Sequence, residues 1–575
     1  MADKKDELSN TASRREFLKF GAGISAGAAV AAVGVLKSNA ALADDFSPSD
    51  FDPSISPPLT ANRRARAAYE LKEQAARQHL SDTFELGSQL DNDDEQRYAA
   101  ENYYASFTKT LPSDQFGEAD PVAFEALQTA MRSGAQNDFD NIPLDVEADR
   151  TLANPQGAFR YELAGLDGHA TRMPPSLRFR GARLAAEMGE VYWQALTRDV
   201  PFIDYASSRS IEDAVHDLNS FSRTAGPKVR GQVTSGTLFR GETPGDVVGP
   251  YISQFLWLGF SFGPVDVEQR YETGIADLDF MTDQANWLNI QRGGTPNEAA
   301  VFDRKKRFIF NNRSLAEYVH RDVLYQAYLH AALILLGFGS EALDEGNPYR
   351  NQVLNQGAFT SLGAPFVIDM VSKAGNLALS GAWFQKWRVH RFLRPEAYAG
   401  RVHFHSTGQR TYELHPDILS SAAVAEVYDR NGTYFLPQAY IEGSPTHPSY
   451  PAGHGAVAGA CVTVLKALFD EHYVIQDPVE ADAKGDRLLA YAGSDELTVG
   501  GELNKLANNV AIGRDAAGVH YRQDGVEGLV TGEQQAIALL QDQSRTLNES
   551  NFGGFSFTKF DGTKVVIEGG EVFAA

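Results

Sequence analysis

Three short segments, far apart in the chain, concentrate lysine, arginine and histidine beside glycine or proline. The first, residues 383–395, carries five basic or imidazole side chains within nine residues, with aromatic residues between them. Burying such a group costs free energy unless an anion accompanies it. Lys386 and Arg394 would share a helix face if the helix continued, but Pro395 favours a helix end near Arg394 that redirects its side chain. The segment predicts an anion site or, alternatively, an amphipathic helix end with solvated charges.

The second segment, residues 446–455, is a proline-rich loop that leads Gly453 and His454 to the start of a predicted helix. Free backbone N–H groups and the helix dipole favour a bound anion at such a position. Gly453 permits close approach of the backbone, and His454 can exchange protons near neutral pH. The alternative is a structural histidine that only forms a hydrogen bond at the helix start.

The third segment, residues 513–524, contains Arg514, His520 and Asp524. An arginine guanidinium is a bidentate donor that suits an oxyanion. Asp524 lies four residues after His520, where a helical geometry would let its carboxylate accept the Nδ1 proton. That contact would leave Nε2 free to act as a base, a nucleophile or a metal ligand.

The sequence patterns around these residues predict that the elements that position them are helices. A capping-box pattern at Ser314 and a 3.6-residue apolar period predict a helix that continues to Gly337. Further helices are predicted over residues 364–386, after His454, and over 536–547, the last capped from Thr531. Near the end of the chain, alternation at 555–558 and a return at 565–567 predict a small β-hairpin. We therefore expect a mainly α protein of packed helical bundles, with the anion pocket in the bundle core.

The start of the chain has the pattern of an export signal. Residues 13–19 form a twin-arginine signature, an apolar Gly/Ala-rich stretch follows over 20–36, and residues 41–43 offer a cleavage site. The alternative, a membrane anchor, is disfavoured because the apolar run is short. The sequence predicts a mature chain from Asp44, periplasmic or secreted through the twin-arginine pathway, without stable membrane association after cleavage.

Composition excludes several classes of function. The chain has 52 Lys/Arg against 75 Asp/Glu and a formal charge of −23, which disfavours binding to nucleic acid. Its single cysteine, Cys461, cannot form an intrachain disulfide and is predicted to be a buried, inert thiol. The predicted division is a signal peptide at 1–43, a lead-in with accessory helices at 44–150, a catalytic domain at 151–548 and a tail at 549–575.

Taken together, the motifs Lys386-x7-Arg394-Pro395, Pro451-Ala452-Gly453-His454 and Gly513-Arg514-x3-Gly518-x-His520-x3-Asp524 resemble a known three-part signature. It is that of the phosphatidic-acid-phosphatase type 2/haloperoxidase superfamily. The longer stretches at 386–397 and 444–455 more closely resemble the vanadium-dependent bromoperoxidases of algal type, and the resemblance covers roughly residues 250–545.

The resemblance implies a vanadate (V5+) cofactor held by one covalent bond, from Nε2 of His520 to vanadium. His454 would bond the apical hydroxide and act as acid and base, and Lys386 would also polarise the activated peroxide. Three cations and a backbone N–H would neutralise the equatorial oxygens: Lys386, Arg394, Arg514 and Gly453.

Further matches concern the surroundings of that site. His447 matches the bromide-oxidising relatives, Trp383 would flank the approach of the halide, and Asp322 would brace an arginine of a neighbouring helix. Asp524 would orient His520. The chain departs from the family at Ala452, where a serine usually donates to vanadate. Losing one neutral donor costs about 1 kcal/mol, so we expect weaker vanadate retention or altered halide turnover.

The implied reaction is oxidation of bromide, or another halide, by hydrogen peroxide to a hypohalous-acid equivalent that halogenates a small organic acceptor. Relatives of this type form homo-oligomers, which the resemblance implies here too. Three alternatives stay open: a secreted acid phosphatase with His520 as nucleophile, a non-enzymatic protein with a degenerate pocket, and a zinc site from His403, His405 and His415. The sequence does not determine the halide.

Overall fold

The structure is a computed structural model that describes residues 61–84, 89–350 and 355–574. The chain divides into two units, Met1–Glu70 and Leu71–Ala575. All of the candidate site residues belong to the second unit. The predicted signal peptide lies outside the described residues. The division of the remaining chain at residues 150 and 548 stays a prediction.

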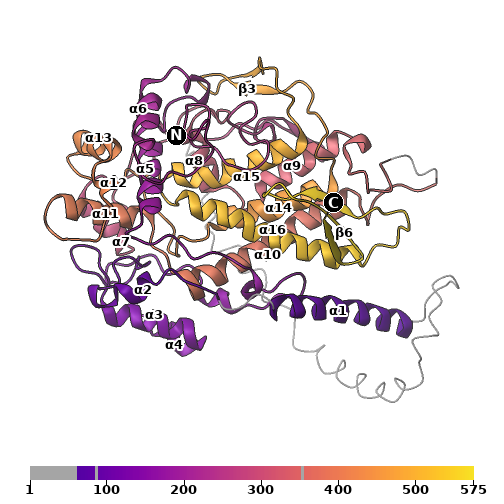
Figure 1. The fold of residues 1–575 in the computed structure, drawn as a ribbon, viewed down its shortest axis with the longest axis horizontal. Coiled ribbons are helices and arrows are strands. Elements are labelled where there is room, and N and C mark those ends of the chain that lie inside the picture. The colour runs from indigo at the N-terminus through magenta and orange to yellow at the C-terminus, as the bar shows by residue number, and fades with distance from the viewer. Residues whose placement is uncertain (1–60, 85–88, 351–354, 575) are drawn as a thin grey trace, which may run out of the picture. The chain divides into compact units, whose positions relative to one another are not determined.

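Helices account for most of the regular structure, which confirms the mainly α class (Figure 1). The first half of the chain contributes short and medium helices: α1(Ala61–Phe84), α2(Asp94–Arg97), α3(Pro121–Ser133), α4(Gln136–Asp140), α5(Ala182–Leu196), α6(Arg209–Leu218) and α7(Gln284–Gln291). The second half contributes α8(Asn312–Arg321), α9(Gln326–Gly337), α10(Ala364–Phe384), α11(Pro395–Ser406), α12(Pro416–Leu419), α13(Ala422–Asn431), α14(Gly453–Leu468), α15(Val499–Ala516) and α16(Arg522–Ser544). Short 3₁₀ turns connect them: η4(Ala99–Glu101), η5(Pro155–Phe159), η6(Gly168–Ala170), η7(Phe202–Asp204), η8(Gln254–Leu256) and η9(Ser340–Ala342).

Three small antiparallel sheets accompany the helices in the part of the chain that the structure describes. Two are hairpins, β1(Phe260–Phe262) with β2(Val265–Val267) and β3(Val479–Ala481) with β4(Leu488–Ala490). The third contains the predicted C-terminal hairpin, β5(Phe555–Thr558) with β6(Lys564–Glu568), and adds a third strand, β7(Glu571–Ala574). Phe557 and Ile567 of this sheet are fully buried, so it covers part of the helical core.

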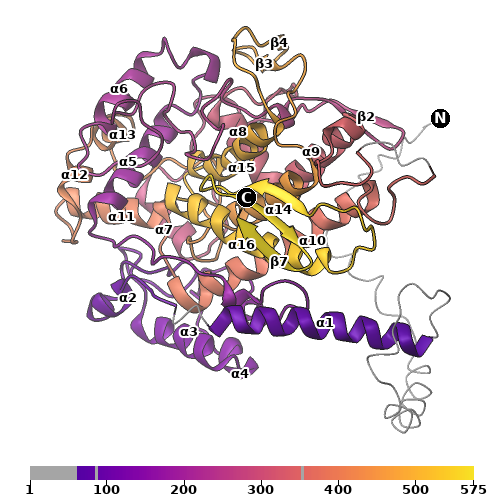
Figure 2. The same cartoon turned by 45° about the vertical axis from the view of Figure 1, so that its right-hand side comes forward.

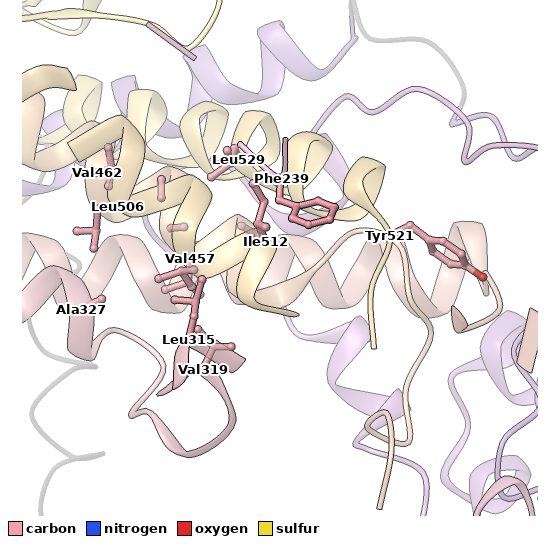
Figure 3. Packing of buried hydrophobic residues seen from close by; sticks show 14 of the residues in the cluster. Phe239, Leu315, Val319, Ala327, Val457, Val462, Leu506, Ile512, Tyr521 and Leu529 are labelled. Atoms are coloured by element: carbon pink, nitrogen blue, oxygen red, sulfur yellow. The ribbon is translucent and has the colours of Figure 1, made fainter. Parts of the chain in front are cut away.

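The helical core is built around α14, which packs against α10, α15 and α16, while α8 packs on α15 (Figures 1 and 2). Figure 3 shows Val457 and Val462 of α14 among the apolar side chains of the neighbouring helices. Fully burying such a side chain contributes about 1.5–3 kcal/mol. Glycines bring α14 and α16 close together, because a Cβ at Gly532 would lie 2.0 Å from the carbonyl oxygen of Ala456. The predicted burial of Cys461 in this helix is confirmed.

Two predictions about helix boundaries were wrong. The helix predicted from Ser314 to Gly337 is two helices, α8 and α9, because the chain leaves α8 at Asp322 in an extended conformation with φ −65° and ψ 151°. The capping residue is Asn311, whose side chain accepts from the backbone N–H of Ser314. The break places the Asp322 carboxylate against α14, a tertiary contact that the apolar period could not reveal.

The predicted cap at Thr531 was also wrong. Thr531 lies inside α16, and its hydroxyl donates to the carbonyl oxygen of Glu527 at 2.8 Å, as in a helix interior. The helix begins nine residues earlier, at Arg522.

Among the described residues, no helix combines the length and the apolar character that crossing a membrane requires.

We predict that Gly532→Ala destabilises the protein through the contact between α14 and α16. The added Cβ forces two backbones apart, and overpacking of this kind typically costs about 1–3 kcal/mol. Chemical denaturation of Gly532→Ala beside Gly337→Ala measures the effect, since a Cβ at Gly337 would meet nothing within 4 Å. Equal stability of the two variants would contradict this description of the core.

Candidate active site

Lys386 lies on a π-helical turn, Gln385–His390, that continues α10 beyond Phe384. Its side chain is fully buried, and Nζ donates to the carbonyl oxygens of Pro448 and Ser449, both at 2.7 Å. Burial and the neighbouring guanidinium of Arg394 lower the pKa of Lys386 well below its ordinary value, against the opposing effect of Asp524. The first and second sequence segments therefore meet at this lysine.

The preceding helical turn ends at His390, and Arg394 is the residue before α11, with Pro395 in the first turn of that helix. The helix is therefore interrupted before Pro395, but Arg394 stands at a helix start and not at the predicted helix end. Its Nε and Nη2 atoms donate to the carbonyl oxygen of His447 at 3.0 and 2.9 Å. Its Nη1 atom donates to the carbonyl oxygen of Val519 at 2.7 Å and lies 2.9 Å from Nε2 of His520. Burial lowers the pKa of Arg394 to about 9. The guanidinium thus joins all three segments.

His520 and Asp524 form the contact that their spacing predicted. Nδ1 of His520 lies 2.8 Å from Oδ2 of Asp524, which also accepts from the hydroxyl of Ser449. An imidazole that donates from Nδ1 to a carboxylate keeps its lone pair on Nε2, and that nitrogen faces Arg394. Burial and the charges of Arg394, Lys386 and Arg514 lower the pKa of His520 well below its ordinary value. The neutral imidazole, with an available Nε2, is therefore the favoured form.

Ser449 was missed in the sequence, although it stands inside the second segment. Its hydroxyl donates to Asp524, its carbonyl oxygen accepts from Lys386, and its N–H donates to the carbonyl oxygen of Phe392 at 2.9 Å. Burial raises the pKa of Asp524 to about 6, and the Ser449 hydroxyl and Lys386 oppose that rise. The signal in the sequence was the place of Ser449 in the proline-rich loop, between Pro448 and Pro451.

Arg514 comes from the last turn of α15 and is 4% exposed. Nη1 donates to the carbonyl oxygen of Val319 at 2.6 Å, and the guanidinium carbon lies 5.5 Å from the centre of the Tyr440 ring. Within the described part of the chain, its buried Nε has no hydrogen-bond partner. An unsatisfied guanidinium N–H is a donor to which an oxyanion can bind.

His454 is the second residue of α14, and its Nε2 lies 3.1 Å from Oδ1 of Asp322. The hydrogen-bond partner of Asp322 is this histidine, and the expectation that Asp322 braces an arginine stays a prediction. Burial raises the pKa of Asp322, but His454 and the charge of Arg514 outweigh that effect and lower it below its ordinary value. The break between α8 and α9 delivers this carboxylate to the start of α14.

Ala452 and Gly453 form the N-terminal edge of the site. Ala452 is the fully buried residue before α14, and Gly453 begins that helix, where backbone N–H groups lack intrahelical acceptors. A Cβ built on Gly453 would lie 3.6 Å from Trp383, so the indole stands over this edge. The Trp383 ring in turn lies 4.8 Å from the ring of His447, whose Nδ1 is 3.0 Å from Nη2 of Arg394.

The charges of the site fit a tetrahedral oxyanion such as vanadate. Lys386, Arg394 and Arg514 are each at most 4% exposed, and each influences the pKa of His520. Asp524, at 0% exposure, is the carboxylate in contact with His520. Several cations gathered around one carboxylate in a low-dielectric interior repel one another, and an anion would relieve that repulsion. Such an anion would have two bonding partners: the unsatisfied Nε–H of Arg514, which can donate a hydrogen bond, and the lone pair on Nε2 of His520, which can bind its central atom.

The three histidines considered for zinc have other partners. His403 and His405 accept at Nδ1 from the backbone N–H groups of Tyr434 and Tyr412, at 3.2 and 3.1 Å. His415 caps α12 by accepting from the N–H of Asp417. Each ring is used by the local backbone, which corresponds to the role of ordinary structural histidines.

Known proteins of one kind are similar to this chain over most of its length. A family model described as the VCPO second helical-bundle domain matches residues 369–549. The vanadium-dependent bromoperoxidase of Corallina pilulifera is 34% identical over 548 residues, covering 81% of this chain and 91% of the relative. That of Ascophyllum nodosum is 35% identical over 526 residues, covering 88% and 92%. The homohexameric structure of the second vanadate-dependent bromoperoxidase from Ascophyllum nodosum superposes with a TM-score of 0.84 at 31% identity, covering 93% of this chain and 98% of that one.

Similarity to vanadium-dependent bromoperoxidases over most of the chain identifies it as a haloperoxidase, a peroxidase of the oxidoreductase class. More closely, the chain belongs to the vanadium-dependent bromoperoxidase family. The resemblance recognised in the sequence is confirmed. The roles of the individual site residues stay predictions, although the structure brings them together.

We predict that Asp322→Asn destabilises the protein in a pH-dependent manner. The lowered folded-state pKa of Asp322 means that its contribution is present above its ordinary value of 3.8 and is lost as the pH falls through the folded-state pKa. The variant should lose about 1–3 kcal/mol near pH 6, and the difference should shrink toward pH 3.

Chemical denaturation across this pH range measures the effect, with the exposed Asp429→Asn of α13 as the control. A loss that does not depend on pH would show that the ionised carboxylate of Asp322 is not what stabilises His454.

Proposed function

We propose that this chain is an exported haloperoxidase that holds vanadate at His520 and oxidises bromide, or another halide, with hydrogen peroxide. The product is a hypohalous-acid equivalent that halogenates small organic acceptors. The observation that carries the proposal is the gathering of three buried cations around His520: Arg394 lies 2.9 Å from its Nε2, and the charges of Lys386 and Arg514 also lower its pKa. The export route rests on the twin-arginine signature at residues 13–19.

Vanadate, when bound, supplies a Lewis-acid centre that activates hydrogen peroxide toward attack by a halide. Lys386, Arg394, Arg514 and the Gly453 N–H would bind its oxygens, and the Nδ1 contact to Asp524 keeps the lone pair of His520 on Nε2, the nitrogen that would bind the metal. Because these donors are buried, they act in a low-dielectric surrounding, where they stabilise developing charge more strongly than they would in water.

His454 is the residue that would transfer a proton during the reaction. When its Nε2 donates a hydrogen bond to Asp322, the lone pair of the ring is on Nδ1. That nitrogen can accept a proton from hydrogen peroxide and return it later. The Asp322 carboxylate stabilises the imidazolium that forms. Its side chain is 4% exposed and that of His454 is 18% exposed, so this exchange takes place at the edge of the buried cluster.

Trp383 and His447 line the side of the site next to Gly453, and we assign to them the approach of the halide. Burial and the charges of Lys386 and Arg394 lower the pKa of His447 well below its ordinary value, which favours a neutral ring. A homo-oligomer is proposed as well, because the structurally similar relative from Ascophyllum nodosum is homohexameric.

The direct test is bromination of a phenol-red-type dye by purified protein with bromide and hydrogen peroxide, with and without orthovanadate. We predict activity that depends on orthovanadate and is abolished in His520→Ala. A parallel assay with a phosphate monoester distinguishes the superfamily's other activity. Hydrolysis of the ester without any vanadate-dependent bromination would make the protein a phosphatase and contradict the proposal.

We predict that Ala452→Ser binds orthovanadate about fivefold more tightly, because one restored neutral donor contributes about 1 kcal/mol. Isothermal titration calorimetry measures the affinity. A serine at this helix start also caps α14, so Ala135→Ser before α4 serves as the control for a capping effect alone. Unchanged affinity in Ala452→Ser would show that the position does not face the oxyanion.

A further inference from the structure

The segment between Lys386 and Arg394 contains a residue in an unusual conformation. Arg391 directly follows the π-helical turn and adopts φ 34° and ψ 44°, in the left-handed region that favours glycine. Its N–H donates to the carbonyl oxygen of Lys386 at 2.9 Å. The direction in which the chain leaves Lys386 and reaches Arg394 is therefore set at this one residue.

The side chain of Arg391 is held by the region before residue 150. Nε and Nη2 donate to the two carboxylate oxygens of Glu95 at 2.7 and 2.8 Å, a bidentate pair. Nη1 donates to the carbonyl oxygen of Trp387 at 2.7 Å, inside the π-helical turn. The two charged side chains are 11% and 18% exposed, so solvent screens the pair only in part.

The region before residue 150 makes a second ion pair with the chain just after Arg394. Nζ of Lys109 forms an ion pair with Glu396 at 2.7 Å, with side chains 2% and 0% exposed. Lys109 also donates to the carbonyl oxygens of Glu442 and Ser444, at 3.1 and 2.7 Å. The other oxygen of Glu396 accepts from the N–H of Ser444 at 2.7 Å. This ion pair thus connects the Arg394 segment to the loop that carries His447 and Ser449.

We propose that Glu95 and Lys109 belong to the oxyanion site as positioning residues, through the ion pairs Glu95–Arg391 and Lys109–Glu396 that bracket Arg394. A left-handed arginine persists only where its surroundings determine its conformation, and Glu95 supplies that constraint. Without it the chain would relax at Arg391, and the distance between the Lys386 and Arg394 donors would change. The inference rests on the proposed function, since it concerns binding of an oxyanion to those two cations.

The experiment uses Arg391→Ala, Arg391→Gly and Glu95→Gln in the full chain. Calorimetric affinity is measured separately for orthovanadate and for inorganic phosphate, together with the thermal midpoint of each variant. Arg391→Ala loses the ion pair and disfavours the left-handed conformation, whereas Arg391→Gly loses the ion pair but tolerates that conformation. The control is Arg97→Ala, which removes an exposed ion pair to Glu413 in the same region without touching residues 386–396.

We expect orthovanadate to bind at least tenfold more weakly to Arg391→Ala and Glu95→Gln, less weakly to Arg391→Gly, and unchanged to Arg97→Ala. Lower thermal midpoints with wild-type affinity would overturn the positioning role and leave the proposed function intact. If the wild-type protein binds phosphate but not orthovanadate, the proposed function is contradicted. In that case, the same ranking of the variants by phosphate affinity would still support the positioning role of the two ion pairs. Binding of neither anion to wild type would overturn both.

Discussion

The electrostatics of three buried cations around one histidine is the constraint on which the rest of this structure depends. Lys386, Arg394 and Arg514 are nearly inaccessible to solvent, although each carries a charge whose burial is costly. Backbone carbonyl oxygens accept from all three, which satisfies individual donors but neutralises none of the charge. A site of this kind is unfavourable for the protein alone and favourable for a protein that binds an oxyanion. Function and fold stability are therefore linked through the same side chains.

The fold meets this constraint by bringing the ends of helices to one place. Lys386 follows α10 and Arg394 precedes α11, whereas His454 is the second residue of α14 and Arg514 lies in the last turn of α15. Helix ends leave backbone groups available, and those carbonyl oxygens and N–H groups surround the cations. The close packing of α14 on α16, made possible by glycines such as Gly532, fixes the start of α14 against Asp524. Packing in the core thus determines the geometry of the site.

Much of this arrangement could be predicted from the sequence because its signals are local. Pro395 marked the redirected Arg394, and the four-residue spacing of His520 and Asp524 marked their contact. Contacts between distant segments could not be predicted, because they produce no local pattern in the sequence. The break at Asp322 lies within an uninterrupted apolar period, and its partner His454 lies more than a hundred residues away. Ser449 acts through its hydroxyl and its backbone together, and Glu95 and Lys109 act from a region that carries none of the family motifs.

In the proposed site, an oxyanion takes the place that the Arg394 guanidinium holds on Nε2 of His520. A crystal structure of the protein with orthovanadate tests this exchange directly. We predict vanadium bonded to that nitrogen, with Lys386, Arg394 and Arg514 donating to its oxygens, and the 2.9 Å contact between Arg394 and His520 broken. A structure at saturating orthovanadate in which that contact persists, with vanadium bound elsewhere or not at all, would contradict it.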